Sequence, residues 1–149
     1  MRTQNSENPE LSHIEFRQDH SSVDWQELKR LFIEAGLGGR KGDKLGRAFI
    51  NSPIVCYAYD ARRLVGVARA VTDGEYHAVI YDVAIHPDYQ GRGLGRKVMG
   101  NVLERLPVWR VMLVASSDVQ GFYTRLGFTP YPDVMARLDS DRLCEATQS

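Results

Sequence analysis

The feature that most constrains the fold of this chain is a glycine-rich turn between a strand-like segment and a helix-like segment. Residues 78–85 are apolar almost throughout, as a strand is when both faces of its sheet are covered. Gly91, Gly93 and Gly95 follow, and residues 95–106 then carry apolar side chains at helical spacing. Glycines let the backbone approach a ligand closely, and the first N–H groups of a helix point at the same place. The turn is therefore predicted to form a cradle for a phosphate-like anion.

The spacing of the glycines excludes two common nucleotide sites. A dinucleotide fingerprint needs G-x-G-x-x-G, and a P-loop needs a lysine and a hydroxyl residue directly after its last glycine. Here the glycines read G-x-G-x-G, and Arg96 follows the last of them. Since Gln90 precedes the glycines, the pattern that remains is Q-x-x-G-x-G.

Two further segments accompany this pattern. Val83, Ala84, Ile85, His86 and Pro87 precede it, and residues 121–128 read Gly-Phe-Tyr-Thr-Arg-Leu-Gly-Phe. The three segments together resemble the GNAT family of acyl-CoA-dependent N-acetyltransferases, and the resemblance spans nearly the whole chain. It implies acetyl-CoA as co-substrate. It also implies an α/β, GNAT-type fold, with a mixed and mostly antiparallel central sheet, one parallel strand pair and about four flanking helices.

Periodicity and turn residues predict the elements. Strands are expected at residues 14–17, 54–59, 63–71, 78–85, 110–115, 128–131 and 134–138. Helices are expected at residues 25–35, capped by Ser22 or Asp24, and at 43–51, 95–106 and 117–126. Short connections predict an antiparallel meander, and the strand reached through residues 95–106 can lie parallel to the one before it.

Composition places these elements in one domain. With 149 residues and 43% hydrophobic content, the chain suits a single core at residues 14–139, between a flexible N-terminal tail (1–13) and a C-terminal tail (140–149). Nineteen basic residues balance nineteen acidic ones, which argues against nucleic acid or an anionic membrane as partner.

Targeting signals and metal ligands are not indicated. The longest apolar runs are about five residues, far below the roughly 20 of a membrane helix. The N-terminus has no signal core, and two cysteines, Cys56 and Cys144, make no disulfide framework, so the cytoplasm is the expected compartment. The four histidines show no metal-ligand spacing, and no metal is predicted.

Asp82 is the one carboxylate in the apolar segment 78–85. It is either a structural aspartate that bonds a neighbouring strand or a general base that acts through water. A base is needed because an aliphatic amine has a pKa of about 10.4 in solution and arrives protonated. Three rival candidates lie near the ends of the same segment: Glu75, His77 and His86.

Tyr123 lies on a helical stripe with Phe122 and Leu126, which packing alone could explain. The resemblance instead puts Tyr123 where the family has its general acid. With a usual pKa of about 10, a tyrosine is protonated at neutral pH and can donate to a departing thiolate. A covalent route through Cys56 is disfavoured, since this cysteine lies in an apolar strand with no histidine nearby in sequence.

The resemblance also implies the cofactor contacts. The backbone around Ala84, at Val83 and Ile85, would pair with the pantetheine arm like an added strand, and an N–H near Val83 would polarise the thioester carbonyl. The pyrophosphate would be held by the turn that opens the helix, namely by Gln90, Gly91, Arg92, Gly93, Leu94, Gly95 and Arg96. Ser116 replaces the family's frequent Asn beside the cofactor arm, and Val119 replaces its frequent Ala.

The acceptor is expected to be a primary amine. Within the family, residues 25–32, 44–52, 64–70 and 81–83 look like the branch of plant and cyanobacterial serotonin N-acetyltransferases, which suggests an arylalkylamine. A protein lysine is an alternative acceptor, and a non-catalytic acyl-CoA-binding module is an alternative function for the same fold. The acceptor pocket is expected beside residues 36–43 and the last two strands, and a homodimer is possible because family members are often dimers.

Overall fold

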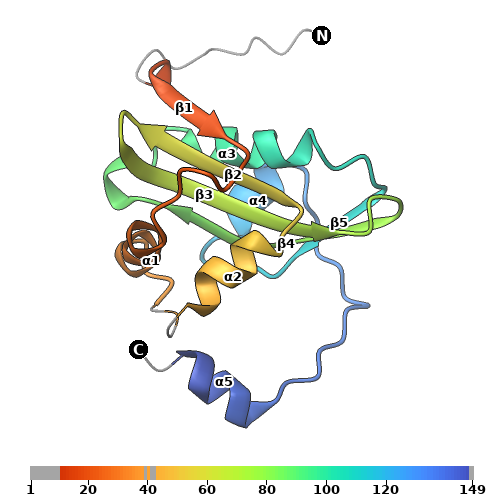
Figure 1. Cartoon of the computed structure of the whole chain (residues 1–149). Coiled ribbons are helices and arrows are strands. Elements are labelled where there is room, and N and C mark those ends of the chain that lie inside the picture. The colour runs from red at the N-terminus through yellow and green to blue at the C-terminus, as the bar shows by residue number, and fades with distance from the viewer. Residues whose placement is uncertain (1–10, 39, 41–42, 148–149) are drawn as a thin grey trace, which may run out of the picture.

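A five-stranded sheet forms the centre of the protein, with the strand order β1-β2-β3-β4-β5 (Figure 1). The computed structural model describes residues 11–38, 40 and 43–147. The strands are β1 (Ile14–Arg17), β2 (Ile54–Asp60), β3 (Arg63–Thr72), β4 (His77–Ile85) and β5 (Arg110–Leu113). The helices are α1 (Trp25–Glu34), α2 (Lys44–Ile50), α3 (Leu94–Leu103), α4 (Gln120–Arg125) and α5 (Ser140–Thr147), with a short 3-10 helix, η2 (Pro87–Tyr89).

The strand directions confirm the predicted mixed sheet. Strands β1 to β4 pair antiparallel in chain order, and β5 pairs parallel with β4. The parallel pair follows from the connection, because α3 carries the chain back to the start of β4 before β5 begins. The first five predicted strands are confirmed to within a few residues at their ends.

Two apolar layers cover the two faces of the sheet. On one face, α1 and α2 enclose a core that includes Phe32, Phe49 and Tyr57. On the other, α3 packs over the sheet through Leu94, Val98, Met99 and Val102, and α4 lies against the same layer. Figure 1 shows the two helix pairs on opposite sides of the strands. A sheet covered on both faces explains why β4 is apolar almost throughout.

Helix α1 shows how local chemistry sets an element in place. The structure selects Asp24 over Ser22 as its N-cap, since the Asp24 carboxylate accepts hydrogen bonds from the N–H groups of Gln26 and Glu27. Such a cap stabilises a helix by about 1 kcal/mol. The helix ends at Glu34, and Gly36 adopts a left-handed φ of +80° just beyond it.

The C-terminal part differs from the sequence expectation. The strands predicted at residues 128–131 and 134–138 are wrong, because neither segment pairs with any described strand. Pro130 and Pro132 have no N–H to offer to a ladder, and alternation alone cannot supply a neighbouring strand. Residues 129–139, here called the C-terminal arm, run without helix or strand, and Figure 1 shows them leading away from the sheet.

The structure at the two ends of the chain can be compared with the tails that the sequence predicts. Helix α5 forms where the sequence suggested only a polar tail, and it lies apart from the other elements in Figure 1. Residues 1–10 of the predicted N-terminal tail are outside the described residues, whereas Leu11 is buried in the core on the α3 side. No helix among the described residues has the length and apolar content to cross a bilayer.

Candidate active site

The glycine-rich turn begins where β4 ends. Gly91 and Gly93 have φ values of +75° and +88°, which side chains other than glycine rarely adopt. Gly93 is the N-cap of α3, and neither a capping side chain nor an acidic residue occupies the first turn of this helix. The N–H groups of that turn are therefore oriented to hold an anion.

The remaining residues of the turn have distinct roles. Gly95 serves packing, because a Cβ atom here would come within 3.2 Å of the Phe122 ring on α4. Leu94 is fully buried, so only its backbone can face a ligand. Arg92 and Arg96 are exposed beside the turn, and the guanidinium of Arg92 lies 5.6 Å from the centre of the Tyr89 ring.

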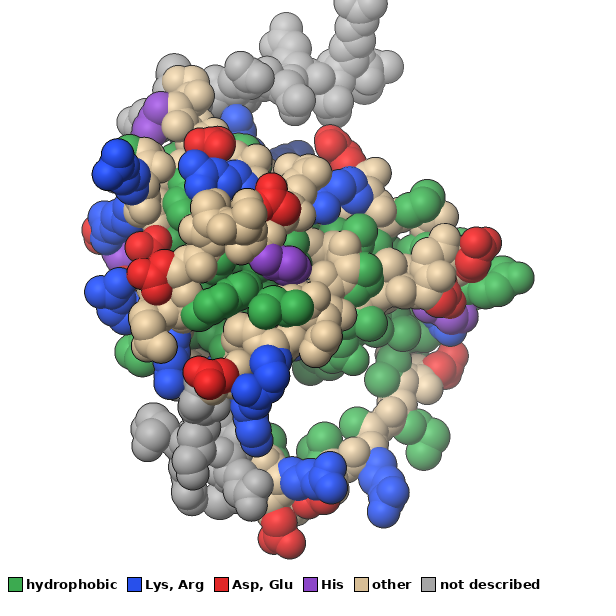
Figure 2. All heavy atoms as spheres, viewed as in Figure 1, with side chains coloured by type: hydrophobic (Ala, Val, Ile, Leu, Met, Phe, Trp, Pro, Cys, Tyr) green, Lys and Arg blue, Asp and Glu red, His purple; other side chains and the backbone are tan. Residues whose placement is uncertain are grey.

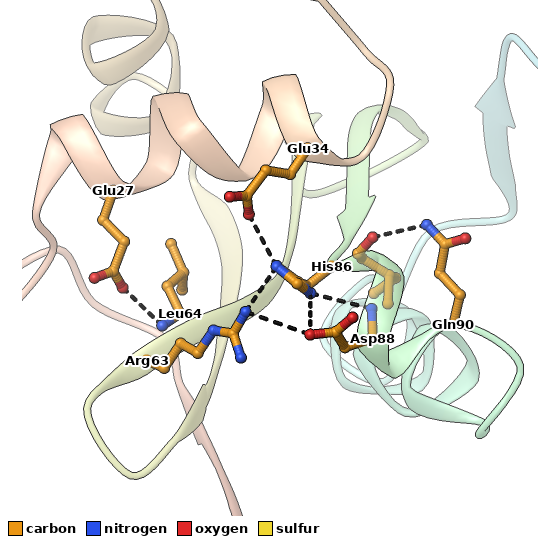
Figure 3. A network of polar contacts seen from close by, with 8 residues as sticks. Glu27, Glu34, Arg63, Leu64, His86, Asp88 and Gln90 are labelled. Carbon is orange, nitrogen blue, oxygen red and sulfur yellow. Dashed lines mark hydrogen bonds and ion pairs between the residues drawn. The ribbon is translucent and has the colours of Figure 1, made fainter.

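A polar network centred on the buried His86 fixes the turn to the rest of the protein (Figure 3). His86 is only 7% exposed, and its Nδ1 accepts a hydrogen bond from the Asp88 N–H at 3.1 Å. Its Nε2 lies 2.9 Å from the Glu34 carboxylate on α1 and 2.8 Å from Arg63 Nη2 on β3. Since Nδ1 accepts, the proton of a neutral ring lies on Nε2 and points to Glu34, so the nearby Arg63 Nη2 cannot also hydrogen-bond to that nitrogen.

The network gives His86 a structural role, which the sequence did not reveal. Two more contacts close the same loop: Gln90 Nε2 donates to the Ile85 carbonyl at 2.9 Å, and the Tyr89 hydroxyl donates to Asp60 at the end of β2. The sequence signal for this role was a histidine and a proline directly after a strand, but several residues that contact His86 lie far from it in the sequence.

Strands β4 and β5 separate in front of this turn. They pair only from His77 to Ile80 on β4 and from Arg110 to Leu113 on β5, whereas β4 continues to pair with β3 as far as Ile85. The register between β3 and β4 shifts at Tyr81, which inserts one extra residue. The edge of β4 from Tyr81 to Ile85 thus faces a gap instead of a strand.

Alternation shows which backbone groups of β4 face that gap. The His86 N–H donates to Val65 on β3, so the backbone of Ala84 also points to β3. The N–H groups of Val83 and Ile85 then point into the gap. The Ile85 carbonyl also points this way, but it already accepts from the Gln90 side chain.

Asp82 is buried and doubly ion-paired on the α1 and α2 side of the sheet. Its Oδ2 lies 2.6 Å from Arg69 Nε, and its Oδ1 lies 3.0 Å from Arg40 Nη2. Arg69 is held further by Ser52 Oγ at 3.3 Å and by the rings of Phe49 and Tyr81, 5.9 and 5.1 Å away. Arg40 is more exposed and belongs to the connection between α1 and α2.

Tyr123 lies on α4, on the opposite face of the sheet. Its ring packs edge-on against Phe122 and Phe128, with ring centres 5.0 and 5.9 Å apart. Burial raises the pKa of the Tyr123 hydroxyl, so the group stays protonated at neutral pH. The two adjacent aromatic residues therefore have different roles. Phe122 packs against Gly95, and Tyr123 lines a cavity.

That cavity, of about 770 Å³, lies beside β5 and not at the glycine turn. It is lined mainly by residues 109–115, by residues 126–132 with Val134, and by Tyr123 from α4. The turn is an open surface of backbone N–H groups, and such a site needs no enclosed volume to bind an anion.

The other candidate site residues lie farther from the turn or are engaged elsewhere. Glu75 and His77 lie at the start of β4, the far end from the turn. Ser116 is exposed, and its hydroxyl donates to Asp118 at 2.5 Å. Cys56 is fully buried, and burial raises its pKa to about 12, which leaves the thiol inert and counts against an acyl-cysteine route. No cluster of three or more metal-ligating side chains exists within the described part of the chain.

Fold and site together match an acyl-CoA-type transferase: strands β4 and β5 separate in front of a glycine-rich turn, and Tyr123 lines a cavity beside β5. The sequence profile of the acetyltransferase (GNAT) family matches residues 11–128. The chain belongs to the GNAT family and is an acetyl-CoA-dependent N-acetyltransferase.

Relatives support the same conclusion. Serotonin N-acetyltransferase 2, chloroplastic, of Oryza sativa subsp. japonica is 36% identical over 126 residues, which cover 80% of this chain and 63% of the relative. Histone acetyltransferase TAP1 of Glycine max is 34% identical over 125 residues, which cover 74% and 54% of the two chains. Similar sequences thus carry names with different acceptors.

Solved structures support the fold. A GNAT-family acetyltransferase from Streptococcus pneumoniae superimposes with a TM-score of 0.71 at 24% identity, covering 84% of this chain and 96% of the other. The predicted fold class is therefore confirmed.

Proposed function

We propose that this protein transfers an acetyl group directly from acetyl-CoA to a primary amine while both substrates are bound. The observation that carries the proposal is the gap between β4 and β5, which opens after Ile80 and leads to the glycine turn. Asp82 lies on one face of the sheet beside this gap, and Tyr123 lies on the other. A thioester in the gap would be reached by a proton acceptor and a proton donor from opposite sides.

The cofactor arm would bind as an added strand. The N–H groups of Val83 and Ile85 offer two hydrogen bonds along the open edge of β4, and the first would polarise the thioester carbonyl. The pyrophosphate would bind to the amides from Gly91 to Arg96, with Arg92 and Arg96 adding positive charge. Ser116 would contact the arm only if its hydroxyl turned away from Asp118.

The chemistry needs two proton transfers. The acceptor ammonium loses a proton to water, and the free amine attacks the carbonyl carbon. When the C–S bond breaks, the Tyr123 hydroxyl protonates the departing thiolate and then regains a proton from solvent. Burial raises the pKa of the Tyr123 hydroxyl, which keeps the group protonated but also makes it a weaker acid, so the transfer depends on close contact with the sulfur.

Asp82 would act on the acceptor side. Both of its carboxylate oxygens bind guanidinium groups, so it would serve first as an anchor for a positive charge and only through water as a base. An incoming ammonium can take the place of the more exposed partner, Arg40. The site would then hold one carboxylate between Arg69 and the acceptor.

An arylalkylamine is the acceptor we favour, since the rice relative is named for serotonin. A protein lysine is the second candidate, in line with the name of the soybean relative. A cytoplasmic location stays a prediction, and the rice relative is described as chloroplastic.

The test is thiol release from acetyl-CoA by the purified protein. Serotonin, tryptamine, spermidine and lysine peptides would be offered in turn, and the acetylated product would be identified by mass. Turnover with an amine of one class names the acceptor. Acetyl-CoA binding without turnover on any primary amine contradicts the proposal.

A further inference from the structure

Glu34 is the last residue of helix α1, a position that the helix itself disfavours for an acid. The C-terminal end of a helix carries partial negative charge, and no basic residue occupies the last turn of α1. The Glu34 side chain is half-exposed, yet its carboxylate lies 2.9 Å from Nε2 of the buried His86 (Figure 3). A residue that conflicts with its own element is expected to serve a contact elsewhere. For Glu34, that contact is the imidazole of His86.

His86 caps the short helix η2, which leads into the glycine-rich turn. Its Nδ1 accepts a hydrogen bond from the Asp88 N–H, as the side chain of an N-cap residue does. Gln90 follows η2 directly and donates to the Ile85 carbonyl, which closes the loop ahead of Gly91. A hydroxyl or carboxylate oxygen can accept in this position at neutral pH, whereas a histidine can cap only while Nδ1 carries no proton. The shape of the loop thus depends on where the imidazole proton lies.

Two neighbours of His86 Nε2 act on that proton in opposite directions. The Glu34 carboxylate accepts and does not donate, so it favours a proton on Nε2. Arg63 Nη2, at 2.8 Å, donates and does not accept, so it favours a bare Nε2 and a proton on Nδ1. The second form also has a partner, because Asp88 Oδ2 lies 3.8 Å from Nδ1. Loss of the Glu34 carboxylate therefore leaves the arginine to decide the position of the proton.

We propose that Glu34 is a positioning residue for acetyl-CoA binding, because it holds the His86 proton on Nε2 and so keeps Nδ1 free to cap η2. Without this carboxylate, Arg63 donates to Nε2, the proton moves to Nδ1, and the Asp88 N–H loses its acceptor. The loop that leads to Gly91 is then less firmly held, and the amides of the turn are less well placed for a pyrophosphate. The inference rests on the proposed function of the turn as the acetyl-CoA site. Helix α1, on the Asp82 side of the sheet, would thus contribute to binding of the donor.

The first test locates the His86 proton by the nitrogen-15 NMR shifts of the imidazole in the wild type, Glu34→Leu and Glu34→Gln. The spectra would be recorded at about pH 8, where an ordinary histidine is neutral. His86→Ala identifies the signals of this ring among the four histidines of the chain. We expect the proton on Nε2 in the wild type and in Glu34→Gln, whose amide oxygen still accepts, and on Nδ1 in Glu34→Leu. A proton on Nδ1 in the wild type, or on Nε2 in Glu34→Leu, overturns the proposal.

The second test is the affinity for acetyl-CoA, measured by isothermal titration. We expect the Kd to rise by about twofold in Glu34→Leu, the lower end of what one hydrogen bond contributes, and to stay at the wild-type value in Glu34→Gln. Gln26→Leu, another exposed position on α1, is the matched control and should bind as the wild type does. In the His86→Ala background, Glu34→Leu should have no further effect, since Glu34 acts through the imidazole. Independent, additive effects of the two changes contradict the proposal.

Failure of the inference and failure of the proposed function give different results. If Glu34→Leu binds acetyl-CoA as the wild type does while Gly93→Asp binds it weakly, Glu34 does not act on the turn, and the inference alone fails. If Gly93→Asp also binds as the wild type does, the turn is not the acetyl-CoA site, and both fail.

Discussion

The proposed donor side and the proposed acceptor side of this enzyme consist of different chemical groups. The donor side consists of backbone: two N–H groups on β4 and the first turn of α3, fixed by glycines and by the His86 network. The acceptor side consists of charged side chains, with Asp82 between Arg69 and Arg40. Backbone groups bind the invariant part of any acyl-CoA, whereas side chains can be exchanged to suit an acceptor. On the proposed assignments, acetyl-CoA binding depends on chain geometry, whereas the choice of acceptor depends on a few charges.

The largest effect is expected for Gly93→Asp, on the donor side. The new carboxylate adds negative charge where the pyrophosphate binds, so acetyl-CoA affinity should fall by roughly 100-fold or more. Isothermal titration with acetyl-CoA measures this. Gly74→Asp is the matched control, because Gly74 has a similar φ of +76° and equally open space but lies in the turn before β4. Equal affinity in the two variants would refute the cradle.

Tyr123→Phe should lower kcat by about 100-fold, since general acids contribute at least that much, and should leave acetyl-CoA affinity nearly unchanged. Steady-state kinetics and titration of acetyl-CoA separate the two quantities. Tyr76→Phe serves as control, because Tyr76 is exposed at the far end of β4. An unchanged kcat in Tyr123→Phe would remove the role of this residue as acid.

Arg40→Ala tests whether Asp82 binds the acceptor ammonium. If an acceptor ammonium displaces Arg40 from Asp82, removing the guanidinium should lower KM for a cationic amine by about threefold to fivefold, the scale of a partly exposed ion pair. The kcat should change little. Arg47→Ala, which removes an exposed arginine from α2, is the control. A raised KM would mean that Arg40 recognises the acceptor and does not compete with it.

His86→Ala should have the smallest effect and should fall on the donor side alone. Loss of the contacts to Asp88 and Glu34 loosens the turn, so we expect KM for acetyl-CoA to rise by about twofold while kcat stays the same. His13→Ala is the control variant, because His13 is an exposed histidine near Asp60. A drop in kcat with constant KM would restore His86 as a candidate base.

Much of the fold could be predicted because its signals are local. Asp24 caps α1 by contacts two and three residues away, and Gly93 opens α3 at the predicted turn. The strand ends and the single parallel pair follow from turn residues and connection length. The C-terminal strands could not be predicted correctly, because a strand exists only beside a partner edge, and residues 134–138 have none within the described chain.

The site was predictable in part. The sequence identified Asp82 and Tyr123 as candidates, but not the faces of the sheet on which they lie. The partners of Asp82 are 13 and 42 residues away, and Glu34 is 52 residues from His86, so no local pattern could reveal these contacts. The extra residue at Tyr81, which changes the register of β4 against β3, is likewise invisible in a single strand.

By itself, the sequence determined the order of the elements from β1 to α4, the glycine-rich turn and the family, because caps, glycines and short motifs act over a few residues. Only the tertiary structure decided which backbone groups face the gap, which arginines hold Asp82, and where the edge of β5 is left open. These are properties of pairing and burial, which arise when segments distant in the chain meet.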